Sequence, residues 1–225
     1  MIVLGIDTAT PATAVALLDT GAPGGGSEGR HDPEPGERPG HTAQLLSLAH
    51  EQLAAAGLRF AHVDRIAVGL GPGGFTGLRI GVATARALAQ AAEAEIVGVS
   101  SLRALAAGAT ATKRSGVLAV IDARRGEVYA AAFRDGEQVL APVAVAPAQI
   151  GAVAGSGWLA VGDGALRFRT ELEGAGCLVP PDGSPQHRVS AGAICRLSLE
   201  VRKGPPLELI VPDYLRPPDA VKTRP

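Results

Sequence analysis

The sequence predicts an α/β fold, on the strength of two observations. Short apolar runs rich in β-branched residues alternate along the chain with segments of helical periodicity, as they do in mixed α/β domains. The order strand, aspartate, turn, strand also occurs twice, over residues 2–18 and 117–133, which suggests two related lobes. A chain of 225 residues with 46% hydrophobic side chains can bury one large core or two smaller ones.

The first block of elements follows from apolar patterning and turn residues. Residues 2–6 form a buried strand that ends at Asp7, and residues 12–18 pair with it as a hairpin. Residues 20–40 are dense in Gly, Pro and charge, so they predict a long mobile loop where a more ordinary chain carries a third strand. The next expected elements are a helix over 42–56 that ends at Gly57, a strand over 63–70, a helix over 76–92, a strand over 96–99, and a helix that Ser100 or Ser101 caps and that runs to Ala107.

The second block begins with strands over 117–121 and 126–133. Residues 158–161 form a further strand, which leads into the turn Gly162-Asp163-Gly164. A helix over 190–202 ends at the Gly and Pro residues of 204–206, and the Pro-rich tail over 211–218 is expected to be irregular.

Composition excludes several classes of protein. With 21 Lys and Arg against 22 Asp and Glu, the chain lacks the positive charge of a dedicated nucleic-acid binder, and 3% aromatic residues argue against a platform for stacking bases. Cys177 and Cys195 form no CxxC pair, which excludes a zinc ribbon; we expect two reduced thiols, with a single disulfide as the alternative. The chain has no apolar run long enough to span a membrane, and its start MIVLGIDTAT is not a signal peptide, so we expect a cytoplasmic protein without membrane contact.

The segment GLGPGGFTGLRIGVATARALAQ, residues 69–90, places glycines between a strand and a helix. Such glycines either let backbone N–H groups approach an anion at the helix N-terminus or simply make a sharp turn. The segment is neither a Walker A loop nor a correctly spaced GxGxxG motif.

Small residues recur along the helix that follows. Gly77, Gly81 and Ala85 lie four apart, with Ala83 and Ala87 beside them. Such a stripe permits close backbone approach, either to the chain's own sheet or to a helix of another subunit. On the second interpretation, Gly81→Leu weakens partner binding while the lobe stays folded.

Asp7, followed by Thr8 and Thr10, resembles the first phosphate loop of actin-like ATPases, and Asp122 is its counterpart in the second block. Two acids at strand ends fit a nucleotide cleft, but no glycine follows Asp7 until Gly21. An actin-fold small-molecule kinase or ATPase that uses Asp7 and Asp122 is therefore the alternative function. No two of the 5 histidines lie three or four residues apart, so no helical face offers a metal-binding pair, and GxSxG is absent.

Five segments together resemble the TsaB family, the dimerisation subunit of the bacterial tRNA threonylcarbamoyladenosine machinery. These segments are MIVLGIDTAT, GLGPGGFTGLRIGVATARALA, VIDARRGEVY, the VGDG turn and the terminal PDYLR. The resemblance implies two actin-like (ribonuclease-H-like, ASKHA) lobes with mixed sheets flanked by helices. We expect an N-terminal lobe over 1–104 and a C-terminal lobe over 105–225, with the tail 206–225 returning to the first lobe.

The resemblance also implies a non-catalytic role beside TsaD, the paralogue that transfers threonylcarbamoyl to the tRNA adenosine next to the anticodon. ATP and a metal ion are then expected on that partner, and no metal or cofactor on this chain. A TsaE-like ATPase joins the complex, the chain forms a homodimer when alone, and tRNA is reached only through the complex. A metalloprotease, once proposed for the wider superfamily, is disfavoured because metal-spaced histidines are missing.

The resemblance points to two groups of residues. The expected partner interface lies on the helices over 42–56 and 77–87 and consists of Leu45, Leu46, Gly77, Ile80, Gly81, Thr84, Ala85 and Leu88. The residues expected at the cleft between the lobes and its loops, without a catalytic role, are Asp7, Thr8, Gly71, Gly73, Gly74, Thr76, Arg79, Asp122, Arg124, Arg125, Glu127 and Tyr129. The chain departs from the family pattern at Gly74, where Ser is usual, in the long loop over 20–40, and at His41-Thr42, where the family has His-Ser.

Overall fold

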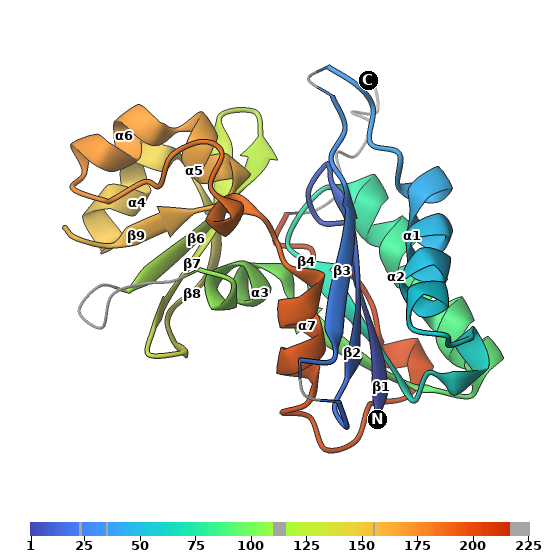
Figure 1. Cartoon of the computed structure of the whole chain (residues 1–225). Coiled ribbons are helices and arrows are strands. Elements are labelled where there is room, and N and C mark those ends of the chain that lie inside the picture. The colour runs from blue at the N-terminus through green and yellow to red at the C-terminus, as the bar shows by residue number, and fades with distance from the viewer. Residues whose placement is uncertain (23, 35, 110–115, 155, 217–225) are drawn as a thin grey trace, which may run out of the picture.

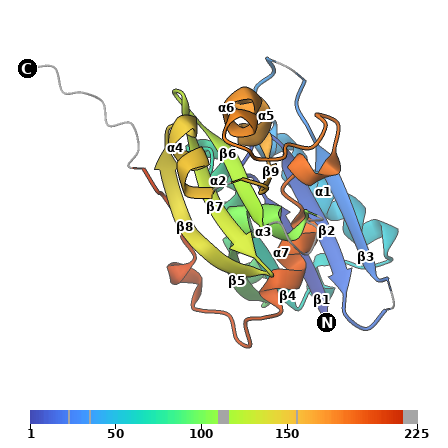
Figure 2. The same cartoon turned by 90° about the vertical axis from the view of Figure 1, so that its left-hand side faces the viewer.

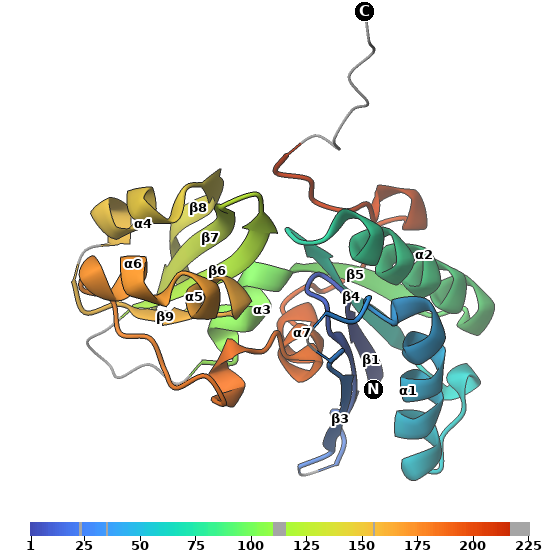
Figure 3. The same ribbon diagram turned by 90° about the horizontal axis from the view of Figure 1, so that it is seen from above.

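A computed structural model describes residues 1–22, 24–34, 36–109, 116–154 and 156–216. Within them, two mixed sheets lie on either side of a central pair of helices, as Figures 1 and 3 show. The first sheet has the strand order β3-β2-β1-β4-β5 and the second has the order β8-β7-β6-β9. The α/β fold class with helix-flanked mixed sheets is thereby confirmed.

The first sheet consists of β1 (Ile2–Asp7), β2 (Thr13–Asp19), β3 (Gly26–His31), β4 (Arg65–Gly71) and β5 (Glu95–Ser100). The second consists of β6 (Val117–Arg124), β7 (Glu127–Arg134), β8 (Glu137–Val145) and β9 (Leu159–Val161). The helices are α1 (His41–Ala55), α2 (Phe75–Ala92), α3 (Ser101–Ala107), α4 (Pro147–Ala154), α5 (Asp163–Arg167), α6 (Arg169–Gly174) and α7 (Ala191–Ser198). Short 3-10 turns occupy Phe60–His62, Pro185–His187 and Leu207–Leu209.

The two sheets repeat one arrangement of strands. β1 pairs antiparallel with β2 and parallel with β4, while β6 pairs antiparallel with β7 and parallel with β9. The repeated pattern strand, aspartate, turn, strand in the sequence corresponds to these two hairpins. Asp7 ends β1, and Asp122 lies near the end of β6.

Three apolar clusters hold the layers together. α1 and α2 pack on the outer face of the first sheet, around Leu4 and Leu45. α3 and α7 lie between the sheets and share one cluster with both of them, which includes Val3 and Ile121 (Figure 3). The outer face of the second sheet packs against α4, α5 and α6 around Leu118, an arrangement that Figure 2 shows from the side.

The prediction of a loop without a strand over residues 20–40 is wrong, because Gly26–His31 forms β3. This strand is at the edge of the sheet and pairs with β2 in regular antiparallel register. It needs little apolar surface, since backbone hydrogen bonds hold it on one side. At Gly29 a Cβ atom would lie 2.6 Å from the amide nitrogen of Gln52, so glycine allows α1 to pack close to the strand.

Polar side chains of β3 also reach the central layer. The Glu28 carboxylate accepts hydrogen bonds from the Ser190 hydroxyl and from the backbone N–H groups of Ala191 and Gly192, at the start of α7. A carboxylate there complements the helix dipole. Glu28 is one of the charged residues that favour a loop in the sequence, and in the structure its carboxylate attaches α7 to the sheet.

The remaining expected elements are present with small shifts of their ends. The helix expected over 190–202 is shorter, since α7 ends at Ser198. Residues 134–157 carry no clear pattern in the sequence, but the chain forms β8 and α4 there. β8 is mostly half-exposed and carries irregularities in its register with β7, so it lacks a clean alternation of apolar and polar residues.

After α7 the chain returns to the first sheet. Ile210 is buried in the cluster under α1 and α2, and the Asp213 N–H donates to the Leu70 carbonyl. Arg216 then reaches the second lobe, where its guanidinium contacts Glu127 and the Ala123 carbonyl. The lobe limits 1–104 and 105–225 remain a proposal, and residues 217–225 of the expected returning tail lie outside the described residues. No described helix is long and apolar enough to cross a membrane.

Candidate functional site

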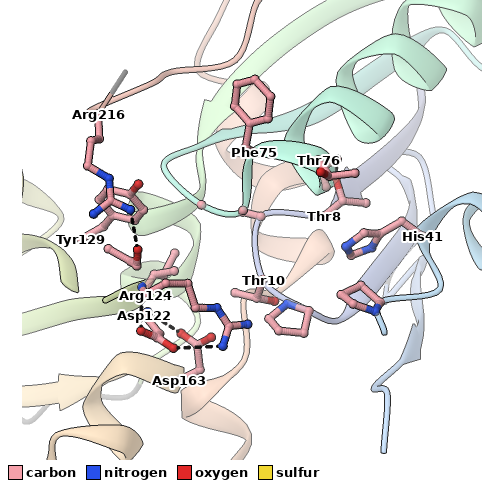
Figure 4. Close-up of a pocket in the computed structure, with 18 of the residues that line it drawn as sticks. Thr8, Thr10, His41, Phe75, Thr76, Asp122, Arg124, Tyr129, Asp163 and Arg216 are labelled. Atoms are coloured by element: carbon pink, nitrogen blue, oxygen red, sulfur yellow. Dashed lines mark hydrogen bonds and ion pairs between the residues drawn. The ribbon is translucent and has the colours of Figure 1, made fainter. Parts of the chain in front are cut away.

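A cleft of about 780 Å³ lies between the two lobes (Figure 4). Its walls come from the segment after β1, the start of α1, the start of α2, the β6–β7 turn, the start of α5 and the C-terminal tail. The residues that line it are Thr8, Ala9, Thr10, Pro11, Arg38, Pro39, His41, Gly73, Gly74, Phe75, Thr76, Gly77, Ile80, Ile121, Asp122, Ala123, Arg124, Arg125, Tyr129, Asp163, Asp213, Tyr214, Leu215 and Arg216.

The glycine loop before α2 packs directly on the segment after β1. A Cβ atom at Gly73 would lie 2.2 Å from the Ala9 carbonyl oxygen, and the Gly74 N–H donates to that same oxygen at 2.7 Å. Gly71 has a φ of 101°, a conformation that favours glycine. These glycines therefore make a sharp turn in close contact with a second loop, which is one of the two interpretations left open by the sequence.

Asp7 lies behind the cleft, which corrects its expected place. Its carboxylate is 1% exposed and accepts hydrogen bonds from the Ser101 hydroxyl at 2.6 Å and from the Ala9 N–H at 3.0 Å. Burial raises the pKa of Asp7, although both hydrogen bonds oppose that rise. This carboxylate joins β1, the following loop and the start of α3, and it does not line the cleft.

Asp122 does line the cleft, but its carboxylate is engaged by arginines. It lies 2.7 Å from the Arg167 guanidinium and 3.3 Å from that of Arg124, and it also accepts from the Arg124 N–H. Arg125 and Gly126 form the tight turn between β6 and β7, and both have positive φ, as does Arg124 at the end of β6. The cleft is also lined by Thr8, Gly73, Gly74, Thr76, Arg124, Arg125 and Tyr129.

Three further expected residues lie next to the cleft rather than in its lining. Arg79 donates to the Tyr214 hydroxyl and stacks over the Phe75 ring at 3.8 Å. Glu127 is paired with Arg216, and Gly71 lies within the turn. Arg79 and Glu127 thus support the wall formed by the tail.

Asp163 is a cleft residue that the sequence analysis did not select. Its carboxylate accepts a hydrogen bond from the Asp122 N–H at 3.0 Å. The turn before it is held by His187, whose Nδ1 accepts from the Gly162 N–H while Nε2 contacts the Pro180 carbonyl. Burial, more than any other effect, raises the pKa of Asp163 to about 6. The signal in the sequence is the turn Gly162-Asp163-Gly164 directly after a strand.

The raised pKa of Asp163 predicts a pH dependence of stability. The folded state holds the proton more tightly than the unfolded state, whose carboxyl has the usual value of 3.8. The free energy of unfolding therefore falls as the pH rises from about 4 to about 6. Asp163→Asn should remove this loss, so that the variant gains about 2 kcal/mol relative to wild type over that range. Denaturant unfolding at several pH values measures it, with the exposed Asp135→Asn as control. Parallel pH curves for wild type and Asp163→Asn would contradict the assignment.

His41 is the second cleft residue that was not selected. It is 5% exposed, and its Nδ1 lies 2.9 Å from the Thr13 hydroxyl. Burial lowers the pKa of His41, and the nearby His31 adds to this effect. The imidazole is therefore neutral at pH 7.

The expected partner interface divides into two sets. Leu45, Gly77, Gly81 and Ala85 are buried within the chain itself, and a Cβ atom at Gly81 would lie 2.2 Å from the Thr8 hydroxyl oxygen. The small-residue stripe thus packs on the chain's own β1 loop, so the interpretation as a surface shared with another subunit is wrong for these residues. Leu46, Ile80, Thr84 and Leu88 are exposed or half-exposed and remain available to a partner.

Among the described residues, no three or more His, Cys, Asp or Glu side chains are grouped so that they could hold a metal ion. Cys177 and Cys195 are both buried free thiols, so the disulfide alternative is not realised.

Comparisons of sequence place the chain among known proteins. Residues 33–157 match the family described as TsaD: tRNA N6-adenosine threonylcarbamoyltransferase. The tRNA threonylcarbamoyladenosine biosynthesis protein TsaB of Escherichia coli is 40% identical over 140 residues, which cover 61% of this chain and 57% of that protein. TsaB of Haemophilus influenzae is 41% identical over 127 residues, 56% of this chain and 51% of its own length. The chain thus matches about half the length of these curated relatives. An uncharacterised protein of Mycobacterium tuberculosis is 35% identical over 224 residues, 97% of this chain and 93% of that protein.

Solved structures give the same answer for the fold. YeaZ from Pseudomonas aeruginosa superposes with a TM-score of 0.75 at 27% identity, covering 95% of this chain and 99% of that chain. Another P. aeruginosa structure, described as similar to peptidase YeaZ, has a TM-score of 0.76 at 29% identity, with 96% of this chain and 99% of that chain covered. A glucomannokinase from Arthrobacter shares the fold alone, at 13% identity over 88% of this chain and 99% of its own, with a TM-score of 0.50. The motifs, the two-sheet architecture and these matches together show that the chain belongs to the TsaB family, within the wider family that the TsaD model describes.

Proposed function

We propose that this chain is a non-catalytic subunit that pairs with a TsaD-like paralogue for threonylcarbamoylation of the tRNA adenosine next to the anticodon. The names of the E. coli and H. influenzae relatives support a role in this modification. In this proposal the chain also helps dock a TsaE-like ATPase, forms a homodimer when alone, reaches tRNA only through the complex and acts in the cytoplasm. ATP and a metal ion bind the partner.

The proposal that the chain is non-catalytic depends on Asp7 and Asp122, whose carboxylates are both bonded to other groups of the protein. A general base or metal ligand needs a carboxylate oxygen that faces the substrate or ion. Asp7 is 1% exposed and bonded to Ser101 and Ala9, while Asp122 is held by two arginines. The alternative, a kinase or ATPase that uses these two acids, has no support in this geometry.

The outer face of α1 and α2 is the surface we propose for the partner. α1 and α2 cover the side of the first sheet that faces away from the second lobe (Figure 1). Leu46 is 51% exposed on α1, and the half-exposed Thr84 and Leu88 lie at helical spacing on α2, with Ile80 at the end of this row that meets the cleft. An exposed leucine beside half-exposed apolar side chains of a neighbouring helix is typical of subunit contacts.

A charge on this face tests the proposal. Leu46→Asp should weaken pairing with the purified TsaD-like paralogue of the same organism by at least about tenfold, because a carboxylate would be desolvated in the contact. Affinity is measured by surface plasmon resonance or sedimentation, and threonylcarbamoyladenosine is quantified in tRNA from cells that carry the variant as their only copy.

The matched control is Val139→Asp, which puts the same charge on an apolar residue 55% exposed on β8 of the second lobe. The control should pair and support modification normally. Equal affinity for Leu46→Asp and wild type would refute the proposed face. The function itself would be refuted if the wild-type chain did not bind the paralogue and if cells that lack the chain modified their tRNA normally.

A further inference from the structure

The first turn of α2 opens into the cleft without any side-chain cap. Its N-cap is Gly74, which offers no side chain, and no acidic residue occupies the first turn. The first N–H groups of a helix have no partner within it, so those of Phe75, Thr76 and Gly77 require one from elsewhere. All three residues line the cleft. α2 has 18 residues, and the aligned peptide dipoles of such a helix place a partial positive charge at its N-terminus.

A buried side chain points to the same place. His41 is 5% exposed and lines the cleft, and its Nε2 has no hydrogen-bond partner among the described residues. The other nitrogen, Nδ1, contacts the Thr13 hydroxyl at 2.9 Å, and that hydroxyl is fully buried with no other partner. A buried hydroxyl proton is costly to leave unpaired, so Thr13 donates and Nδ1 accepts. The ring proton of the neutral imidazole is then on Nε2, as a donor.

The two sets of donors face one space. A Cβ atom at Gly77 would lie 2.9 Å from the His41 Nε2 and 2.2 Å from the Thr8 carbonyl, so the absence of a side chain at Gly77 keeps the imidazole against the first turn of α2. Figure 4 shows His41 beside Thr8 and Thr76, with Asp163 and Asp122 on the far side of the cleft. Asp122 and Asp163 are thus remote from these donors, and the third acid of the lining, Asp213, belongs to the C-terminal tail.

From this geometry we infer that the cleft binds a small molecule through an oxyanion group, a phosphate or a carboxylate, held by the first-turn N–H groups of α2 and by the His41 Nε2–H. The first-turn N–H groups of α2 and the His41 Nε2–H are all donors, which suits an acceptor that carries negative charge. Arg38 also lines the cleft, and its positive charge adds attraction for an anion. A volume of about 780 Å³ accommodates a molecule larger than the oxyanion alone. This site does not depend on the proposed partner.

The test titrates the full chain with inorganic phosphate and, separately, with acetate, while chloride keeps the ionic strength constant. Backbone amide and imidazole nitrogen NMR signals are followed. The amides of residues 75–77 and the His41 Nε2 should shift together, with one dissociation constant. The ion that binds more tightly identifies the phosphate or the carboxylate source.

Two variants remove one donor each. His41→Phe keeps a ring of similar size, and Phe75→Pro deletes an N–H at the first helical position, where proline is tolerated. Each should weaken binding about tenfold, the effect of one hydrogen bond to a charged group. Phe75→Ala removes the same ring but keeps the N–H, so it is the reference for Phe75→Pro. His50→Ala removes an exposed histidine of α1 and should bind like wild type.

Other outcomes overturn the inference. One is the absence of shifts at residues 75–77 in the folded wild-type chain. Another is a set of shifts confined to surface arginines, and a third is equal affinity for Phe75→Pro and Phe75→Ala. The wild-type titration decides the matter even if His41→Phe fails to fold.

Discussion

Replacement of Gly81 by leucine is expected to destabilise the fold by about 3 kcal/mol or more, because the new side chain has no space to occupy. A Cβ atom at Gly81 would already lie 2.2 Å from the Thr8 hydroxyl oxygen. That hydroxyl donates to the Gly77 carbonyl in a buried hydrogen bond at 2.8 Å, so α2 and the β1 loop must separate to admit leucine. Denaturant unfolding measures the loss directly.

The matched control is Ala83→Leu, two residues further along the same helix on its exposed side. It introduces the same side chain into solvent, where leucine is a good helix former, and should change stability by less than about 0.5 kcal/mol. A Gly81→Leu variant as stable as Ala83→Leu would contradict the packing of α2 on the β1 loop and would restore the stripe as an outer surface.

Removal of the Arg65 side chain should have an effect of similar size, about 3 kcal/mol. Arg65 is 4% exposed on β4, and its guanidinium donates to Glu95 and to the carbonyls of Ser198 and Val201. The Ser198 carbonyl ends α7 and the Val201 carbonyl follows it, and a cation there complements the helix dipole. Arg65→Ala leaves them and the Glu95 carboxylate without their partner, and it should lower the midpoint of thermal unfolding.

Arg103→Ala provides the comparison. Arg103 is also paired with a residue just after α7, Glu200, but the two side chains are 40% and 55% exposed. Such exposed pairs contribute below about 1 kcal/mol. If Arg65→Ala cost no more than Arg103→Ala, the buried guanidinium would not be what attaches α7 to the first sheet. If Arg65→Ala loosens the attachment of α7, amide hydrogen exchange in this variant should speed up more in α7 than in β6.

Much of the fold could be predicted from the chain because the signals are local. The β1 and β6 strands are apolar runs that end near an aspartate, and α2 follows a glycine turn, so backbone propensity and burial agree at each place. β3 could not be found in this way. Its residues Gly-Ser-Glu-Gly-Arg-His carry the composition of a loop, and the strand exists because β2 presents a free edge and α1 packs over Gly29.

The site was only partly predictable for the same reason. The positions of Thr8, Gly73, Gly74 and Asp122 at the cleft follow from strand ends that meet at one edge of each sheet. Asp7 has the same sequence context as Asp122, but its carboxylate turns inward to Ser101 on α3, a residue 94 positions away. A single histidine such as His41 carries no pattern in the sequence, and its place in the cleft depends on Thr13 and Gly77 from two other elements.

The sequence by itself determined the α/β class, the two related hairpins, most of the helix and strand positions and the resemblance to the TsaB family, because each depends on residue types at short spacing. Only the tertiary structure decided which face of α2 is buried, whether Asp7 or Asp163 faces the cleft, and which donors converge beside Gly77. A repeat of small residues is equally compatible with the chain's own sheet and with another subunit. The physical reason is that burial and hydrogen bonding at these positions are set by partners far away in the chain, which packing alone brings together.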